Sequence, residues 1–178
     1  MNTIFLIGYM CSGKTTLGRA LGELTGRPFV DLDDLIEQRA GRSVKEIFAT
    51  EGEGRFREME REALAEASAL PGGAIVACGG GTPCFGDNMD FMNGIGLTVH
   101  LVVSDRGRFL NRLSEGKAKR PLIAALSDSE IEQFVDRQLE VRLPHYTRAK
   151  AEFDSSRLES ESEIAETAGM FIRKYIRP

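Results

Sequence analysis

The fold of this chain is decided by residues 8–15, which read Gly8-Tyr9-Met10-Cys11-Ser12-Gly13-Lys14-Thr15. The stretch fits the pattern G-x-x-x-x-G-K-[ST], in which glycines let the backbone curl so that its N–H groups face an anion. It follows an apolar, β-branched run at residues 3–7 and precedes residues 14–25, whose leucines recur at helical spacing. A helix that begins at the loop adds its positive end. The sequence therefore predicts a buried strand, a phosphate-binding loop and a helix.

The loop also predicts its ligand, which is ATP or GTP together with Mg²⁺. In such loops the lysine reaches the β- and γ-phosphates, and the hydroxyl of the next residue lies at the metal. Lys14 and Thr15 hold these positions. We expect the nucleotide to contact Gly8, Cys11, Ser12, Gly13, Lys14, Thr15 and Thr16. The alternative is a glycine-rich turn that binds no ligand.

Outward from the loop, apolar strands and amphipathic helices alternate about five times. Further strands are predicted at residues 28–31, 74–77, 97–103 and, weakly, 151–154. Helices are predicted at residues 33–40, from 43 onward, 56–70, 105–113, about 128–143 up to Pro144, and after a capping box of Ser160 and Glu163. This order predicts one α/β domain over residues 1–178, with a parallel sheet covered by helices on both faces.

Composition narrows the classes of function. The chain has 178 residues, with 23 basic and 27 acidic side chains and a net charge of −4. Its basic segment, residues 106–120, suits a small anionic ligand better than nucleic acid. Its apolar runs are too short to span a membrane, and its three widely spaced cysteines indicate a reducing compartment. The first residues have no basic region followed by a long apolar stretch, so we expect no signal or transit peptide. We therefore expect a cytoplasmic monomer whose partners include neither nucleic acid nor membrane.

Two carboxylates follow the second predicted strand, at the edge of a parallel sheet where ligands bind. Phosphoryl transfer needs one carboxylate near the metal and another to accept the proton of the nucleophile. Asp31 and Asp33 suit these roles, because residues two apart face the same side of an extended chain. The alternative, that Asp33 only caps the next helix, explains one carboxylate and not both.

An arginine and a run of glycines extend this candidate site. Arg57 and Glu60 lie three residues apart on a predicted helix, so the carboxylate can hold the guanidinium in place. Gly79–81 come directly after a strand and can offer backbone N–H groups to a ligand oxygen. The plainer interpretations are a surface ion pair and a flexible turn.

Together these stretches resemble the shikimate kinases over residues 1–177. The matching stretches are the loop at 8–15, Asp31-x-Asp33, Ile47-Phe48-Ala49, Phe56-Arg57-x-x-Glu60, Gly79-Gly80-Gly81, Arg112, Arg120-Pro121-Leu122 and Arg142-x-Pro144-x-Tyr146. Many kinases share the loop, whereas the combination is distinctive. The resemblance implies a single-domain P-loop kinase fold with five parallel strands in the order 2-3-1-4-5. It also implies an acceptor-binding region at about residues 32–62 and a mobile lid at about residues 114–127.

The resemblance implies a reaction as well, in which the γ-phosphoryl group of ATP passes to the 3-hydroxyl of shikimate on the route to aromatic amino acids. Asp33, Lys14 and Arg120 are then the catalytic residues, with Asp33 as candidate base, and Asp31 joins Thr15 at Mg²⁺. The implied acceptor-binding residues are Asp33, Arg57, Gly79, Gly80, Gly81, Arg142, Phe48 and Phe56. The arginines grip the carboxylate, because an arginine fork matches a carboxylate bidentately. Arg112 lies against the adenine, and Arg120 reaches the transferred phosphate from the lid.

Two other functions stay open. A gluconate kinase is one, because its acceptor also presents a carboxylate and hydroxyls. A nucleotide-binding module without catalysis is the other, although such a module has no need of Asp33 or Arg57.

A separate hypothesis concerns Cys11, which stands where the family usually has a small residue. Oxidation or alkylation of its thiol, beside a helix N-terminus, would block ATP.

Overall fold

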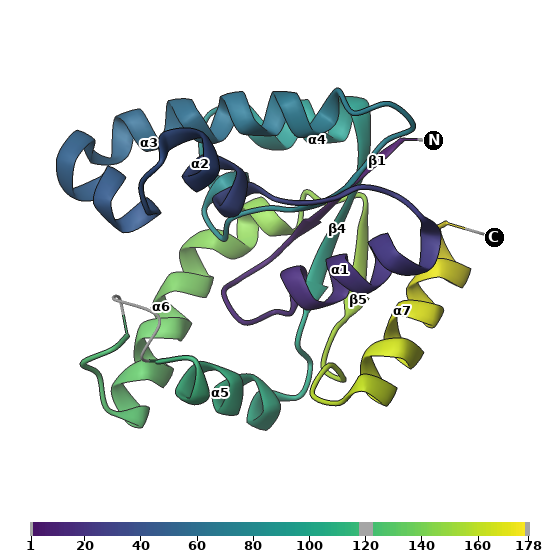
Figure 1. Cartoon of the computed structure of the whole chain (residues 1–178). Helices are drawn as coiled ribbons and strands as arrows, with labels where there is room; N and C mark the ends of the chain where they lie inside the picture. The colour runs from purple at the N-terminus through teal and green to yellow at the C-terminus, as the bar shows by residue number, and fades with distance from the viewer. Residues whose placement is uncertain (1, 118–122, 177–178) are drawn as a thin grey trace.

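The protein is described by a computed structural model, which covers residues 2–117 and 123–176. Its strands form one parallel sheet in the order β2-β3-β1-β4-β5, as the resemblance implied (Figure 1). The strands are β1 (Thr3–Ile7), β2 (Phe29–Asp31), β3 (Ile75–Ala77), β4 (Gly96–Val102) and β5 (Ala151–Asp154). Since all the strands are parallel, their carboxyl ends lie at one edge, and the loops that follow them meet there.

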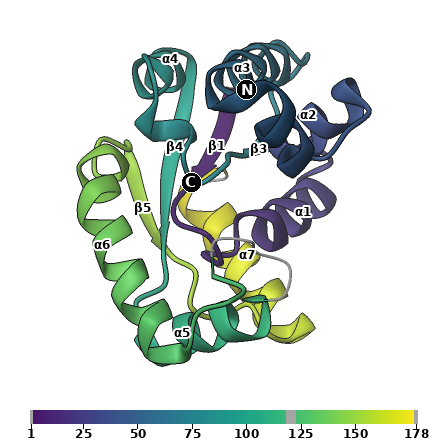
Figure 2. The same cartoon turned by 90° about the vertical axis from the view of Figure 1, so that its left-hand side faces the viewer.

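Helices cover both faces of this sheet. They are α1 (Lys14–Thr25), α2 (Leu32–Ala40), α3 (Val44–Ser68), α4 (Asn88–Ile95), α5 (Arg106–Glu115), α6 (Asp128–Tyr146) and α7 (Glu161–Tyr175), with a short 3₁₀ turn, η1 (Thr82–Cys84). Helices α1 and α7 lie side by side on one face, and α3, α4 and α6 lie on the other (Figures 1 and 2). In the described ranges, 2–117 and 123–176, no helix is long and apolar enough to cross a membrane.

The central strand explains why the core has two parts. Side chains alternate along β1, so Ile4 and Leu6 join the cluster under α1 and α7. Phe5 and Ile7 join the cluster under the helices of the opposite face. All four are almost fully buried, which is typical of a central strand in a parallel sheet. This packing fixes the end of β1, from which the phosphate loop emerges.

Several expectations about the helices need correction. Pro144 does not end α6, because the lost backbone bond falls in its last turn and the helix continues to Tyr146. Ser160 caps α7, but Glu163 does not complete the box, since its carboxylate accepts from the Glu159 amide and from Arg108 instead. By contrast, the two helices predicted between residues 43 and 70 are confirmed, since α3 consists of two helical segments that meet at a break in helical geometry at Gly52.

Two further differences concern segments near the site. Helix α4 was not predicted, and it packs through the buried Met89 and Met92, three residues apart. Helix α5 extends to Glu115, so it takes up the first residues of the expected lid at 114–127. Residues 118–122, with Arg120 among them, lie outside the described part of the chain.

Candidate active site

The phosphate loop has the backbone that its glycines predict. Gly8 has φ 143° and Gly13 has φ 85°, both in the range that favours glycine. A Cβ on Gly8 would lie 2.8 Å from the Leu101 carbonyl oxygen, and one on Gly13 would collide with Leu158. Lys14 folds back over the loop, and its Nζ donates to the carbonyls of Gly8 and Tyr9 at 2.9 and 2.8 Å. The loop is thus shaped for an anion and its lysine is held at the centre.

Cys11 stands out within this loop. Its φ of 63° makes it the one non-glycine residue with positive φ in the described ranges. Its Sγ lies 3.5 Å from the Arg112 carbonyl oxygen, and its own carbonyl accepts from Arg112 at 3.4 Å. The thiol also lines the cavity described next. That its modification blocks ATP stays a prediction.

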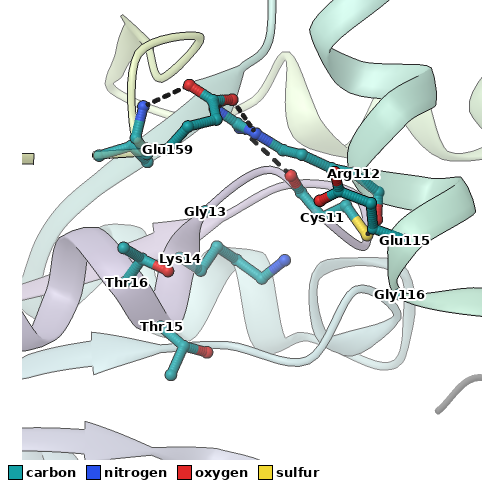
Figure 3. A pocket seen from close by; sticks show the side chains of 10 residues that line it. Cys11, Gly13, Lys14, Thr15, Thr16, Arg112, Glu115, Gly116 and Glu159 are labelled. Atoms are coloured by element: carbon teal, nitrogen blue, oxygen red, sulfur yellow. Dashed lines mark hydrogen bonds and ion pairs between the residues drawn. The ribbon is translucent and has the colours of Figure 1, made fainter. Parts of the chain in front are cut away.

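A cavity of about 690 Å³ opens beside the loop (Figure 3). Its lining residues are Cys11, Gly13, Lys14, Thr15, Thr16, Arg112, Glu115, Gly116, Leu158 and Glu159. Figure 3 shows the Arg112 side chain reaching across the cavity between Cys11 and Glu159. Its guanidinium donates to the carbonyls of Ser155 and Ser156 at 3.1 and 2.6 Å, and to the Glu159 carboxylate at 2.8 Å. Arg112 therefore ties α5 to the phosphate loop and to the loop after β5, where a nucleotide base would lie.

Asp31 and Asp33 are brought together, but not in the way predicted. Asp31 is the N-cap of α2, and its carboxylate accepts from the Asp33 amide at 3.2 Å. Asp33 lies in the first helical turn, so it is not the cap and the two residues do not alternate along an extended chain. The Thr15 hydroxyl donates to the other Asp31 oxygen at 2.7 Å. The proposed metal-binding pair is therefore in direct contact.

Burial and neighbouring charges shift the pKa values of Asp33 and Lys14. Burial, with the carboxylates of Asp31 and Glu60 nearby, raises the pKa of Asp33 to about 6. Burial lowers the pKa of Lys14 to about 8, although Asp33 opposes this shift. A carboxyl with a pKa near neutrality is basic enough to accept a proton and is still charged at pH 7.

The triple glycine is explained by crowding and not by flexibility. None of the three glycines has a positive φ, and each faces a charged side chain. A Cβ on Gly79 would lie 3.3 Å from Asp33 Oδ1, one on Gly80 3.3 Å from Arg142 Nη1, and one on Gly81 3.0 Å from Arg57 Nη2. Any side chain here would fill the space between these groups. The three glycines thus lie against Asp33, Arg142 and Arg57, and this cluster of glycines and charged groups is called the pocket below.

Arg57 is held at this pocket as its sequence spacing predicts. Its Nη1 pairs with Glu60 Oε2 at 2.9 Å, and Glu60 is only 1% exposed. Glu60 Oε1 accepts from the Thr82 hydroxyl at 2.6 Å. The interpretation as a surface ion pair is therefore wrong, because the carboxylate is buried and satisfied on both oxygens. Phe48 and Phe56 stack nearby, with ring centroids 4.6 Å apart.

Sequence reasoning missed three side chains of the pocket. The Phe85 ring centroid lies 3.6 Å from the Arg57 guanidinium carbon, and Thr82 anchors Glu60. The Tyr9 ring lies 5.5 Å below the Arg142 guanidinium. Tyr146, noted only as part of a motif, donates from its hydroxyl to the Gly80 carbonyl at 2.6 Å. The position of Tyr9 within the phosphate loop was the one signal that could have linked the loop to the acceptor pocket.

A Mg²⁺ ion beside the phosphate loop would have few protein ligands. In the described ranges no group of three or more His, Cys, Asp or Glu side chains could hold a metal ion. Mg²⁺ at kinase sites takes one or two protein ligands and completes its shell with phosphates and water. The contact of Thr15 with Asp31 offers hard oxygen donors of this kind. The residues present therefore fit such an ion.

Fold and site together define a class. A phosphate loop at the end of the central strand lies beside a carboxylate and two arginines, which is the arrangement of a P-loop kinase for a small anionic acceptor. The family model described as shikimate kinase matches residues 10–173, and this chain belongs to that family. It is a nucleotide-binding transferase of the shikimate pathway.

Individual relatives agree over the whole length. The shikimate kinase of Parabacteroides distasonis is 41% identical, over 97% of this chain and 99% of its own. The crystal structure of shikimate kinase from Bacteroides thetaiotaomicron is 40% identical, with a TM-score of 0.90 and coverage of 97% of both chains. Shikimate kinase from Acinetobacter baumannii, solved in complex with shikimate, is 31% identical with a TM-score of 0.81, over 98% of this chain and 92% of its own.

Proposed function

We propose that this protein transfers the γ-phosphoryl group of ATP to the 3-hydroxyl of shikimate, giving shikimate 3-phosphate and ADP. One observation carries the proposal. Arg57, Arg142 and Asp33 each face one glycine of Gly79–81, beside the phosphate loop. This pocket suits a small ring that bears one carboxylate and several hydroxyls. The relative from Acinetobacter baumannii, solved with shikimate, supports the same acceptor.

The acceptor carboxylate binds between the two arginines. Arg57 is fixed by the buried Glu60, so its fork is pre-organised for a carboxylate. Arg142 approaches from α6 above Gly80. Phe48 and Phe56 supply the apolar wall for the ring. With the carboxylate held at one end, the ring can present a hydroxyl to Asp33 at the other.

Asp33 accepts the proton of that hydroxyl. The oxygen forms a bond to the γ-phosphorus as the bond between this phosphorus and the β,γ-bridging oxygen breaks, and ADP leaves. With a pKa of about 6, Asp33 is ionised at neutral pH, and this pKa is high enough for the carboxylate to accept the proton. Asp33 lies beside Gly79 and close enough to Lys14 for their charges to interact, which puts it between the two halves of the site.

Lys14 and the loop amides hold the phosphates. In the structure Lys14 Nζ is bonded to two loop carbonyls, and we propose that it exchanges these for β- and γ-phosphate oxygens when ATP binds. Thr15 and Asp31 would hold Mg²⁺, which offsets phosphate charge when bound. The cavity under Arg112 would take the adenosine.

Arg120 remains part of the proposal on the sequence alone. It lies in residues 118–122, outside the described ranges. From the lid it would stabilise negative charge in the transition state and help exclude water, which would otherwise compete as acceptor. Arg120→Ala is expected to lower kcat far more than it weakens ATP binding. An unchanged kcat would remove this role.

The test is ADP release with Mg-ATP and, in turn, shikimate, gluconate or no acceptor. Turnover that depends on shikimate supports the proposal, whereas turnover with gluconate alone overturns it. ATP binding without any turnover would favour the non-catalytic module. The solved gluconokinase from Sinorhizobium meliloti shares only the fold, at 16% identity and a TM-score of 0.51.

We further propose that the enzyme acts in the cytoplasm as a monomer, with neither nucleic acid nor membrane as partner.

A further inference from the structure

The Arg57 guanidinium is bound by two carboxylates at once. Its Nη1 pairs with Glu60 Oε2 at 2.9 Å. Its opposite edge is taken by Glu53, whose Oε1 accepts from Nη2 at 2.9 Å and from Nε at 3.3 Å. The Nε and Nη2 groups form an edge on which an arginine binds a carboxylate bidentately. That edge is the one an acceptor carboxylate needs once Glu60 has taken Nη1.

The two carboxylates differ in how firmly they are held. Glu60 is 1% exposed and is also bonded to the Thr82 hydroxyl, so its pair with Arg57 is permanent. The Glu53 side chain is 55% exposed, and an ion pair at such a site is worth at most about 1 kcal/mol. Glu53 can therefore be displaced by a competing carboxylate, whereas Glu60 cannot.

The backbone places Glu53 at a position from which its side chain can release Arg57. Gly52 has φ 80° and ψ 176°, a conformation that is almost restricted to glycine. This residue breaks α3, and Glu53 is the first residue after the break. Glu53, Arg57 and Glu60 all lie on the segment after the break, and of the two carboxylates only that of Glu53 is exposed. Release of Glu53 thus requires no change in the buried anchor.

We propose that Glu53 is a built-in competitor for the acceptor carboxylate. It neutralises the Nε and Nη2 edge of Arg57 in the absence of the acceptor, and the acceptor carboxylate displaces it on binding. The Phe85 ring, 3.6 Å from the guanidinium carbon, covers one face of the guanidinium, so the exchange takes place at its edge. Glu53 then sets acceptor affinity. This inference rests on the proposed function, because it takes the acceptor to be a carboxylate bound at Arg57.

The test compares two glutamates on the same helix. Glu53→Gln removes the competing charge with little change of shape, and we expect the KM for shikimate to fall two- to five-fold, roughly what the loss of an exposed ion pair allows. The KM for ATP should not move. Glu58→Gln is the matched control, because Glu58 is 67% exposed and pairs at 2.9 Å with Arg55 rather than Arg57. It should leave the KM for shikimate unchanged.

A second readout separates charge competition from a general effect on the pocket. With methyl shikimate, which has no carboxylate charge, Glu53→Gln should give no gain. Calorimetry of shikimate binding without nucleotide should show the same two- to five-fold gain as KM. A KM that is unchanged or higher in Glu53→Gln, or an equal gain with the methyl ester, overturns the inference. Failure of the proposed function would appear differently, as wild-type enzyme that releases no ADP with shikimate.

Discussion

On the nucleotide side, the site is built mainly from backbone, whereas on the acceptor side it is built from charged side chains. The phosphate loop is shaped by positive φ at Gly8 and Gly13, and Arg112 is bonded to loop carbonyls. Across the site, Asp33, Arg57 and Arg142 crowd over glycines whose φ is ordinary. Glycine thus serves two purposes, conformational freedom on one side and space on the other.

The two sides also differ in electrostatics. Arg112 lies in a network of carbonyls and Glu159, so its charge is well compensated. Asp33 instead lies among other carboxylates, which raise its pKa together with burial. The charge of Asp33 on the acceptor side is therefore poorly compensated, whereas the charge of Arg112 on the nucleotide side is well compensated, and a perturbed pKa of this kind is typical of functional sites.

The largest expected effect is at the base. Asp33→Asn keeps the size of the side chain but cannot accept the proton, so kcat should fall by about 10² to 10⁴. ATP binding, measured by calorimetry in the absence of acceptor, should change little. A kcat within a few-fold of wild type would mean that the reaction needs no carboxylate at this position.

Two glycine substitutions should affect the acceptor side and the nucleotide side of the site separately. Gly81→Ala places a Cβ 3.0 Å from Arg57 Nη2, so we expect the KM for shikimate to rise about ten-fold, the cost of a shifted carboxylate contact of about 1.4 kcal/mol. Gly13→Ala meets both a positive φ of 85° and Leu158, so it should weaken ATP binding. Steady-state kinetics with each substrate varied in turn would show this. If both variants affected the same substrate, the division of the site would be wrong.

The pH profile of kcat/KM should depend on the ionisation of both Lys14 and Asp33. In the free enzyme kcat/KM should rise about ten-fold per pH unit up to about 6, where Asp33 ionises, and then level off. It should decline above about 8, where Lys14 loses its charge. Initial rates between pH 5 and 9.5 test both limbs. A flat profile between pH 5 and 7 would exclude Asp33 as the base.

Asp33 should also cost stability at neutral pH. Its folded pKa of about 6 exceeds the ordinary value of 3.8, so the folded state binds an extra proton between these values. The contribution of Asp33 to stability is therefore greatest below pH 3.8 and is lost as the pH rises through 6. We expect Asp33→Asn to raise the free energy of unfolding by about 1–3 kcal/mol at pH 7.5, and by less at pH 5. Denaturant unfolding at both values measures it. A gain that does not grow with pH contradicts the assignment.

Most of the fold was predictable because strong local signals agreed. The apolar run at β1 and the loop glycines each placed an element that the structure confirms, and α3 and α6 begin within one residue of the predicted positions 43 and 128. Helix α4 gave little signal, because it has only 8 residues and contains a glycine. The interruption between the two helices predicted from residue 43 and at 56–70 is confirmed, although its position at Gly52 was not predicted.

The residues of the candidate site also divide into those that could be predicted from the sequence and those that could not. Residues inside contiguous motifs, such as Lys14 and Arg57, could be named from the sequence because their spacing carries the chemistry. Thr82 and Phe85 could not, because they reach Glu60 and Arg57 only through the packing of η1 against α3. Spacing also misjudged Asp33, because the Asp31 side chain caps α2 and makes its neighbour helical.

Identification of the phosphorylated product shows directly which hydroxyl of the acceptor receives the phosphoryl group. The enzyme would be incubated with Mg-ATP and shikimate, and the purified product examined by phosphorus and proton NMR. We predict a single phosphomonoester whose phosphorus couples to the proton on carbon 3, in an amount equal to the ADP formed. A phosphate on another hydroxyl, or ADP formed with free phosphate and no ester, would contradict the account.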